Sequence, residues 1–169
     1  MKKALIGTAL VSGMLLSTPT VMAGTGYIGL DYQMFRLVSE GIDDLQPEGA
    51  ALRLGGSLSD NFMIEGRIGQ STGSDETDGV SLKVDDYMGL YLKAGVDVMD
   101  MLFPYVAAGF SKVDLTTDND PSETEGGFSY GFGADVHLGN FQVGAEWMMM
   151  LDEADYELKT TSVSVAWRF

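Results

Sequence analysis

Apolar and polar residues alternate along almost the whole chain after residue 24. The alternation has a period of two, and no segment places its apolar residues at the 3.6-residue spacing of an amphipathic helix. Each alternating run holds roughly ten or more residues, the length that a tilted strand needs to cross a membrane. The pattern predicts an all-β fold with strands near residues 26–36, 48–58, 61–71, 83–97, 102–113, 126–138, 140–151 and 157–169.

The connections between these eight predicted strands alternate between short and long. Three are tight turns, at residues 59–61, 98–101 and 139–140. The others are longer and polar, and they cover residues 37–47, 71–81, 114–125 and 152–156. Short turns at one end, longer loops at the other and an even strand count are typical of bacterial membrane barrels. We therefore expect an eight-stranded antiparallel up-and-down transmembrane β-barrel, with both termini on the short-turn side, in the periplasm.

The two faces of each predicted strand differ in kind. One face is apolar, as in Leu90 and Leu92, and the other carries glycine, tyrosine and charged residues, as in Tyr91 and Lys93. The charges on the polar face balance, with four carboxylates and four basic side chains. They are Asp31, Arg53, Glu65, Arg67, Lys93, Asp135, Glu146 and Arg168.

Periodicity alone does not say which face points inward. A soluble, lipocalin-like barrel would bury the apolar face. The balanced charges favour the opposite arrangement, because a narrow interior must pair its charges whereas the surface of so acidic a chain need not. The glycines of the polar face also leave room for long side chains across a small bore. We therefore expect the charged residues to form a structural network in the interior. Lys112, which follows Phe110 on an apolar face, is placed at the rim.

The first 23 residues read as a removable export signal. Lys2 and Lys3 are followed by an apolar run over residues 4–16, which is too short to span a bilayer as a helix. Small residues before Ala23 fit a cleavage site after that position. The mature chain is then expected to be residues 24–169, a single barrel domain.

Composition excludes several classes of function. The net charge is −15, from 10 Lys+Arg and 25 Asp+Glu, so the chain repels nucleic-acid phosphates. There is no Cys and one His, which excludes disulfides, thiolate sites and multi-histidine metal sites. The sequence therefore predicts no catalytic, metal-ligating or cofactor-binding residues, and no cofactor.

Acidic residues concentrate in the four longer connections, which contain no Lys or Arg. Sixteen of the 25 lie in these stretches or at their edges: Glu40, Asp43, Asp44, Glu48, Asp75, Glu76, Asp78, Asp114, Asp118, Asp120, Glu123, Glu125, Asp152, Glu153, Asp155 and Glu157. The plain interpretation is a solvated rim that prevents aggregation. A sharper one is weak binding of divalent cations, which would bridge the loops to lipopolysaccharide phosphates. Asp118, Asn119 and Asp120 alternate oxygen ligands but lack the glycine and terminal glutamate of an EF-hand.

Several short motifs resemble the small eight-stranded outer-membrane barrels of the OmpA/OmpX type, also described as outer-membrane β-barrel domains. They occur at residues 26–30, 61–67, 103–109, 131–134 and 167–169. The resemblance covers the whole mature chain and implies an integral protein of the Gram-negative outer membrane, in contact with its lipids and lipopolysaccharide and monomeric. It also implies that the insertion machinery recognises the chain end through Val165, Trp167 and Phe169, although Ser164 stands where the family usually has glycine.

The resemblance leaves three classes of activity to compare. Some barrels of this size modify lipid A, but that chemistry needs a histidine at the outer rim, and His137 lies beside the tight turn at 139–140. An eight-stranded interior can just be filled by side chains, which disfavours open conductance. We therefore expect a non-enzymatic structural or surface-interaction protein whose interior is plugged by paired charges. The alternative is a small-solute channel or transporter of the outer membrane.

Overall fold

The computed structural model describes residues 26–39, 42–45, 47–71, 75–77, 80–117, 120–152 and 156–169. Every regular element among them is a β-strand. Within these ranges, no helix is long and apolar enough to cross a membrane. The predicted signal and its cleavage site at Ala23 lie outside the described residues.

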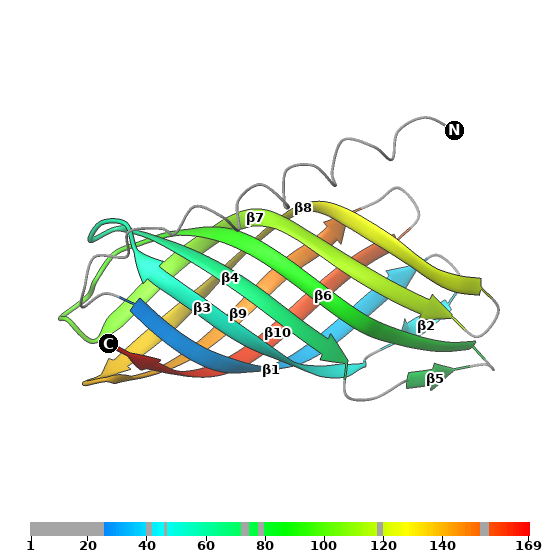
Figure 1. Cartoon of the computed structure of the whole chain (residues 1–169), viewed down its shortest axis with the longest axis horizontal. Coiled ribbons are helices and arrows are strands. Elements are labelled where there is room, and N and C mark those ends of the chain that lie inside the picture. The colour runs from blue at the N-terminus through cyan, green and yellow to red at the C-terminus, as the bar shows by residue number, and fades with distance from the viewer. Residues whose placement is uncertain are drawn as a thin grey trace.

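Eight long strands form a closed antiparallel barrel, as predicted (Figure 1). Each strand pairs with its neighbours in the chain, and the last strand pairs with the first. Two short strands, β2 (Ile42–Leu45) and β5 (Asp75–Thr77), pair with β1 and β6 beyond the barrel wall. The barrel strands are β1 (Gly26–Ser39), β3 (Glu48–Ser57), β4 (Phe62–Ser71), β6 (Val80–Gly95), β7 (Leu102–Thr117), β8 (Asp120–Leu138), β9 (Phe141–Asp152) and β10 (Tyr156–Arg168).

The strands are staggered as they close the barrel. Successive cross-strand partners, starting from Arg36 in β1 and passing through every barrel strand, return to β1 at Gly26. Position 36 minus position 26 gives a stagger of ten residues around the circuit. Such a stagger requires strands that tilt from the barrel axis, as Figure 1 shows.

The apolar faces of the strands point outward. In β1, Leu30 is 59% exposed, whereas its neighbour Asp31 is 2% exposed. In β8, Phe132 is 59% exposed and Asp135 is 1% exposed. The soluble-barrel alternative requires the reverse. An apolar outer surface around a charged interior is stable in a bilayer, whose hydrocarbon takes the place of water.

The tight turns and both ends of the described chain lie at one end of the barrel (Figure 1). Gly26 and Phe169 exchange backbone hydrogen bonds there, with N···O distances of 3.1 and 2.9 Å. In the turn between β6 and β7, Met99 and Asp100 both have φ near +58°. Positive φ at two central residues matches the right-handed twist of a hairpin.

Three of the four longer connections are more regular than predicted. Strand pairing between β7 and β8 continues to Thr117 and Asp120, so most of residues 114–125 forms a hairpin and not a loop. β2 and β5 add pairing within 37–47 and 71–81. The prediction of loops failed because backbone pairing beyond the membrane tolerates polar side chains.

A bulge in β9 also departs from strict alternation. Leu151 pairs with Leu158 and Met149 pairs with Lys159, so β9 carries one extra residue, Met150, between these two pairs. Residues 148–151 are consequently all buried. Strict alternation from Phe141 through Trp147 predicts that Met149 faces outward, and the bulge makes that prediction wrong.

Candidate functional site

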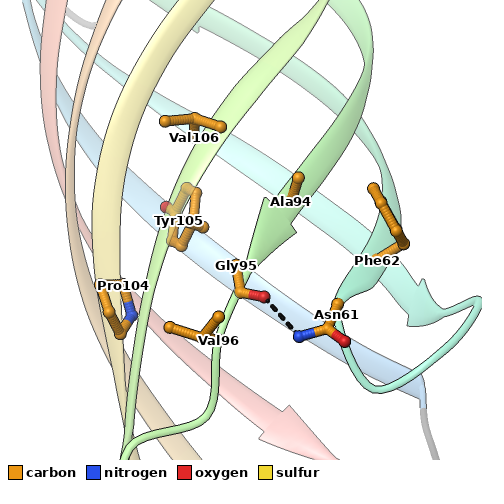
Figure 2. Close-up of a pocket in the computed structure, with 8 residues that line it drawn as sticks. All are labelled: Asn61, Phe62, Ala94, Gly95, Val96, Pro104, Tyr105 and Val106. Atoms are coloured by element: carbon orange, nitrogen blue, oxygen red, sulfur yellow. Dashed lines mark hydrogen bonds between the residues drawn. The ribbon is translucent and has the colours of Figure 1, made fainter.

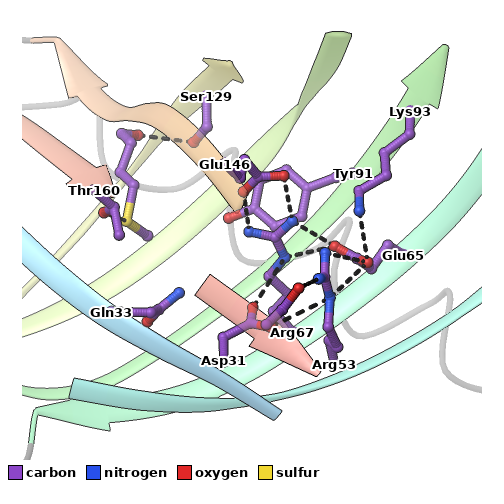
Figure 3. Close-up of polar contacts among 12 residues, drawn as sticks. Asp31, Gln33, Arg53, Glu65, Arg67, Tyr91, Lys93, Ser129, Glu146 and Thr160 are labelled. Carbon is purple, nitrogen blue, oxygen red and sulfur yellow. Dashed lines mark hydrogen bonds and ion pairs between the residues drawn. The ribbon is translucent and has the colours of Figure 1, made fainter. Parts of the chain in front are cut away.

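Glu65 lies at the centre of the charged interior (Figure 3). Its carboxylate accepts hydrogen bonds from Arg53 Nε at 2.9 Å and Arg67 Nε at 2.6 Å. Lys93 Nζ lies 3.0 Å from Glu65 Oε2, and the Tyr27 hydroxyl donates to the same oxygen. One carboxylate from β4 therefore connects three cations that come from β3, β4 and β6.

Arg67 also connects β4 to β9. Its Nη1 and Nη2 donate to Glu146 Oε1 and Oε2, at 2.5 and 2.8 Å. Tyr105 in β7 donates to Glu146 Oε2 at 2.9 Å. Bidentate arginine–carboxylate pairs are geometrically specific, so this contact fixes two strands that are not neighbours in the barrel wall.

Two further carboxylates are held more loosely. Asp31 Oδ1 lies 3.4 Å from Arg53 Nε, and Asp31 Oδ2 lies 4.0 Å from Arg67 Nε. Asp135 Oδ2 lies 3.7 Å from Lys93 Nζ. Both aspartates are buried, and no hydrogen bond reaches their carboxylate oxygens within the described part of the chain. They contribute charge at short range without the directed contacts of Glu65 and Glu146.

The structure brings together seven of the eight residues that the sequence placed in the network. Arg168 is half-buried and takes part in none of the ion pairs among the described residues. It lies four residues beyond Ser164, whose hydroxyl accepts from Arg53 Nη1 at 2.6 Å. Four residues correspond to about 13 Å along a strand, which puts Arg168 near the tight-turn end. The expected four-to-four balance is thus three cations against four carboxylates.

Aromatic rings complete the network, a role that the alternation of side chains does not reveal. Lys93 Nζ lies 4.2 Å from the centre of the Tyr105 ring, and the Arg67 guanidinium lies 4.8 Å from that of Tyr91. Cations over aromatic faces gain electrostatic stabilisation. Tyr27 and Asp31 are four residues apart in β1, so their side chains point to the same face. Alternation alone is therefore enough to predict that Tyr27 points inward. Tyr105 lies on the inward face of β7, opposite the face that carries Phe110.

Glycines give these rings their space. A Cβ on Gly55 would overlap the Tyr27 ring, and a Cβ on Gly133 would overlap the Tyr105 hydroxyl. The glycines of the inward face thus allow tyrosines to reach across the bore, as the sequence predicted.

An apolar layer covers the charged centre on the side of the longer hairpins. It is built from four buried side chains on four strands: Phe35, Val113, Leu151 and Leu158. Beneath it, Gln33 Nε2 donates to the Tyr87 hydroxyl at 2.7 Å, and Tyr91 and Ser111 hydroxyls lie 2.6 Å apart. The interior therefore passes from ion pairs through hydroxyl contacts to a hydrophobic layer.

An open groove lies on the outer surface, across β4, β6 and β7 (Figure 2). Phe62, Val96 and Val106 supply apolar walls, and Asn61 Nδ2 donates to the Gly95 carbonyl at 3.0 Å. The groove shares the apolar character of the surrounding wall and gathers no charged side chains, so it offers no catalytic chemistry.

His137 lies near the tight-turn end, where the sequence placed it. Its ring stacks on Phe103 with centroids 6.4 Å apart, and its Nδ1 lies 3.9 Å from Asp97 Oδ1. Within the described ranges, no three His, Asp or Glu residues are grouped so that they could hold a metal ion. Asp118 and Asn119 of the divalent-cation hypothesis lie outside those ranges.

The residues expected to guide assembly lie at the end of β10. Val165 and Trp167 point outward, and the Trp167 ring meets Phe141 edge-to-face with centroids 4.8 Å apart. Phe169 is exposed and pairs with Gly26 through the backbone. This end of the chain therefore closes the barrel against β1.

Comparisons with known proteins agree with this architecture. Ail, the attachment invasion locus protein of Yersinia pestis, superposes with a TM-score of 0.65 at 19% identity, over 88% of this chain and 100% of Ail. Neisserial surface protein A superposes with a TM-score of 0.65 at 14% identity, over 85% of this chain and 97% of that protein. At these identities the likeness shows the fold alone. No curated protein matches the chain.

A family model gives the assignment that these distant structures do not. The model described as the outer membrane protein beta-barrel domain matches residues 6–169. The match covers the barrel from β1 to β10, and it places the chain in the bacterial outer membrane. The chain therefore belongs to the outer membrane protein beta-barrel domain family.

Proposed function

We propose that this protein is a non-enzymatic outer-membrane barrel with a structural or surface-interaction role, and that its interior is sealed. The observation that carries the proposal is the pairing of Arg67 with Glu146 across the bore, in which Arg67 also donates to Glu65 and Glu146 also accepts from Tyr105. Because Arg67 and Glu146 satisfy each other across the bore, they leave no open polar path for a solute at that level.

The apolar layer supports a sealed interior as well. An ion that passed the charged centre would next meet Phe35, Val113, Leu151 and Leu158, which offer no polar contact. Crossing such a layer requires the loss of hydration without replacement. A small-solute channel, the alternative function, would need both barriers to open.

The absence of enzymatic activity is inferred from the surroundings of His137. It faces Phe103 and the half-exposed Asp97 near the tight turns. A lipid-modifying enzyme needs its base at the level of the outer headgroups. The buried carboxylates Glu65 and Glu146 are already engaged by arginines, so they are better suited to structure than to proton transfer.

We assign the tight turns and the chain ends to the periplasm and the longer hairpins to the cell exterior. Outer-membrane barrels have short periplasmic turns and longer extracellular connections. The chain then inserts as a monomer through the insertion machinery, which would read Val165, Trp167 and Phe169 at the periplasmic end.

We expect the exterior hairpins to bind a partner of different charge from the ligand that is bound in one structure of Ail. That structure contains the heparin analogue sucrose octasulfate, a polyanion. The hairpin stretches of this chain are rich in Asp and Glu and contain no Lys or Arg, so they repel polyanions. The partner is therefore cationic, or the hairpins meet lipopolysaccharide phosphates through weakly bound divalent cations.

Liposomes that carry the refolded chain test this function. We expect them to retain entrapped small solutes, to bind an immobilised polylysine surface in a salt-dependent manner, and not to bind immobilised heparin. A variant with Asp114, Asp118, Asp120, Glu123 and Glu125 changed to their amides should bind polylysine less. Solute leakage from wild-type liposomes would favour the channel, and binding to heparin would contradict the acidic-surface interpretation.

A further inference from the structure

The groove on the outer surface continues along the barrel wall. It has a volume of about 670 Å³ where it lies between Phe62, Val96 and Val106 (Figure 2). A second hollow of about 200 Å³ lies against Leu90 and Ala108. Both hollows lie across β4, β6 and β7, so they follow one another along the same three strands. We call the two hollows together the furrow.

Small side chains form the floor of the furrow. Ala94 in β6 pairs with Phe62 in β4 and with Val106 in β7, so an alanine lies between two larger side chains (Figure 2). In the next outward row, Ala108 in β7 pairs with Leu92 in β6. Each alanine leaves a hollow between larger apolar side chains, and in a bilayer hydrocarbon fills such a space at the lowest cost.

The length of the furrow matches one leaflet of the membrane. Val96, at its tight-turn end, and Leu90 are six residues apart, which corresponds to about 20 Å along a strand. Because barrel strands tilt by about 35–45°, this length spans about 15 Å along the barrel axis. One leaflet contributes half of a hydrocarbon core that is about 30 Å thick. The furrow is therefore as long as one acyl chain of the leaflet that meets the tight turns.

A backbone acceptor is left open at the tight-turn end of the furrow. Val96 faces Pro104 across β6 and β7, and the Val96 amide donates to the Pro104 carbonyl at 3.2 Å. Proline has no N–H, so the reciprocal hydrogen bond of this antiparallel pair cannot form. Asn61 Nδ2 donates to the neighbouring Gly95 carbonyl at 3.0 Å, but no group in the described part of the chain donates to the Val96 carbonyl. A ligand with an N–H donor would satisfy it.

The two turns beside this acceptor are acidic. Asp60, Asp97 and Asp100 are exposed there. Residues 57–61 and 96–101, which contain these carboxylates, include no Lys or Arg. This end of the furrow therefore attracts a cationic headgroup and repels an anionic one.

We propose that the furrow binds one phosphatidylethanolamine molecule of the leaflet at the tight turns. One acyl chain lies in the furrow, and the ammonium lies between Asp60, Asp97 and the Val96 carbonyl. A primary ammonium has three N–H donors, whereas the choline headgroup has none and phosphatidylglycerol is anionic. The inference goes beyond the proposed function, because it uses the membrane location of the barrel and not its sealed interior.

A tryptophan in the furrow reports the lipid that lies there. The full mature chain carries Phe62→Trp, Trp147→Phe and Trp167→Phe, and a matched chain with Trp167→Phe alone keeps Trp147 on β9. Each chain is refolded into phosphatidylcholine vesicles that contain a small, equal fraction of phosphatidylethanolamine, phosphatidylglycerol or phosphatidylcholine with brominated acyl chains. Bromine quenches tryptophan only at contact, so the quenching compares three headgroups at one position.

The headgroup chemistry predicts a ranking of the three lipids. We expect phosphatidylethanolamine to quench the furrow tryptophan about threefold more effectively than phosphatidylcholine, the effect of about one exposed ion pair, and phosphatidylglycerol to quench it least. The three lipids should quench Trp147 equally. In the double variant Asp60→Asn/Asp97→Asn, the preference at the furrow should disappear.

Filling the furrow tests the place of the acyl chain. Ala94→Leu and, independently, Ala108→Leu put a larger side chain on the floor, so each should reduce quenching by phosphatidylethanolamine to the level of phosphatidylcholine. Ala145→Leu is the matched control, because Ala145 is also exposed on the outer wall, in β9, and should leave the preference unchanged. Heat-modifiable mobility verifies that each variant is folded.

Three results would overturn the proposal. The first is equal quenching of the furrow tryptophan by all three lipids, or a preference for phosphatidylglycerol. The second is a preference for phosphatidylethanolamine that survives in the double asparagine variant and in both leucine variants, or that appears equally at Trp147. The third is quenching that falls as the protein-to-lipid ratio rises, which would assign the furrow to a second copy of the chain.

Discussion

Arg67 and Glu146 face each other across the interior, 79 residues apart in sequence, and join through two parallel hydrogen bonds of 2.5 and 2.8 Å. Both side chains are almost wholly buried. β4 and β9 are not adjacent in the sheet, so this contact acts through the bore and not along the wall. Loss of this contact would leave the Arg67 cation without its bidentate partner in a confined, buried space.

The change Glu146→Ala is expected to destabilise the barrel strongly. Arg67 would keep Glu65 but lose its bidentate partner, and removal of one member of a buried pair costs about 3–5 kcal/mol. Urea unfolding in liposomes, followed by tryptophan fluorescence, measures the free energy of unfolding. Glu157→Ala is the matched control, because that half-exposed carboxylate pairs with Lys159 at the surface and is worth about 0–1 kcal/mol. Equal losses in the two variants would contradict the interior role of Glu146.

Asp31 and Glu65 should respond very differently to neutralisation. Glu65 accepts hydrogen bonds from Arg53, Arg67 and Tyr27, so Glu65→Gln is expected to cost about 3–5 kcal/mol. Asp31 accepts none within the described part of the chain, and its network has one carboxylate more than cations. Asp31→Asn should therefore cost less than about 1 kcal/mol or stabilise the barrel. Urea unfolding measures the free energy of unfolding of both variants. A larger loss of stability in Asp31→Asn than in Glu65→Gln would refute this ranking.

Two glycines distinguish the inner packing from the outer surface. A Cβ at Gly109 would overlap the backbone carbonyl of Leu90, so Gly109→Ala must displace β6 from β7 and should cost about 1–3 kcal/mol. A Cβ at Gly66 meets no atom within 4 Å, so Gly66→Ala should change stability by less than about 1 kcal/mol. Both variants are compared by urea midpoint. A neutral Gly109→Ala would mean that the two strands are less closely packed than the structure shows.

Deletion of Phe169 tests the proposed assembly signal. The truncated chain keeps almost the whole β1–β10 ladder, so refolding in detergent should remain near normal. Insertion in cells should fall, because the terminal aromatic would no longer be read by the insertion machinery. Heat-modifiable gel mobility of cell envelopes and of detergent-refolded protein gives the comparison. Normal insertion in cells would leave Phe169 as an ordinary interface aromatic.

The sequence predicted well which face of each strand points inward, and poorly how far along the barrel axis each residue lies. Alternation assigns each residue to one side of a strand, and this was enough to place Asp31, Arg53 and Glu65 inside. The position along the barrel axis depends on a ten-residue stagger that exists only once β10 meets β1. For that reason Arg168 was assigned to the correct face but not to its height, and the contacts between the inward-facing tyrosines and the cations were missed.

No sequence signal marks the β9 bulge. Residues 148–151 are Met-Met-Met-Leu, so an inserted residue leaves the apolar pattern unchanged. The hairpin extensions were missed for a related reason: Asp and Thr resemble loop residues, yet their backbones continue the ladder to Thr117 and Asp120.

Conductance across a planar bilayer tests the sealed interior most directly. Refolded wild-type chain, with folding verified by heat-modifiable mobility, is inserted and held under voltage in concentrated salt. The ion pairs around Glu65 and the apolar layer above them predict no steady unitary current, and brief openings at most. A stable open conductance level in the wild-type protein would contradict a sealed interior and identify the barrel as a channel.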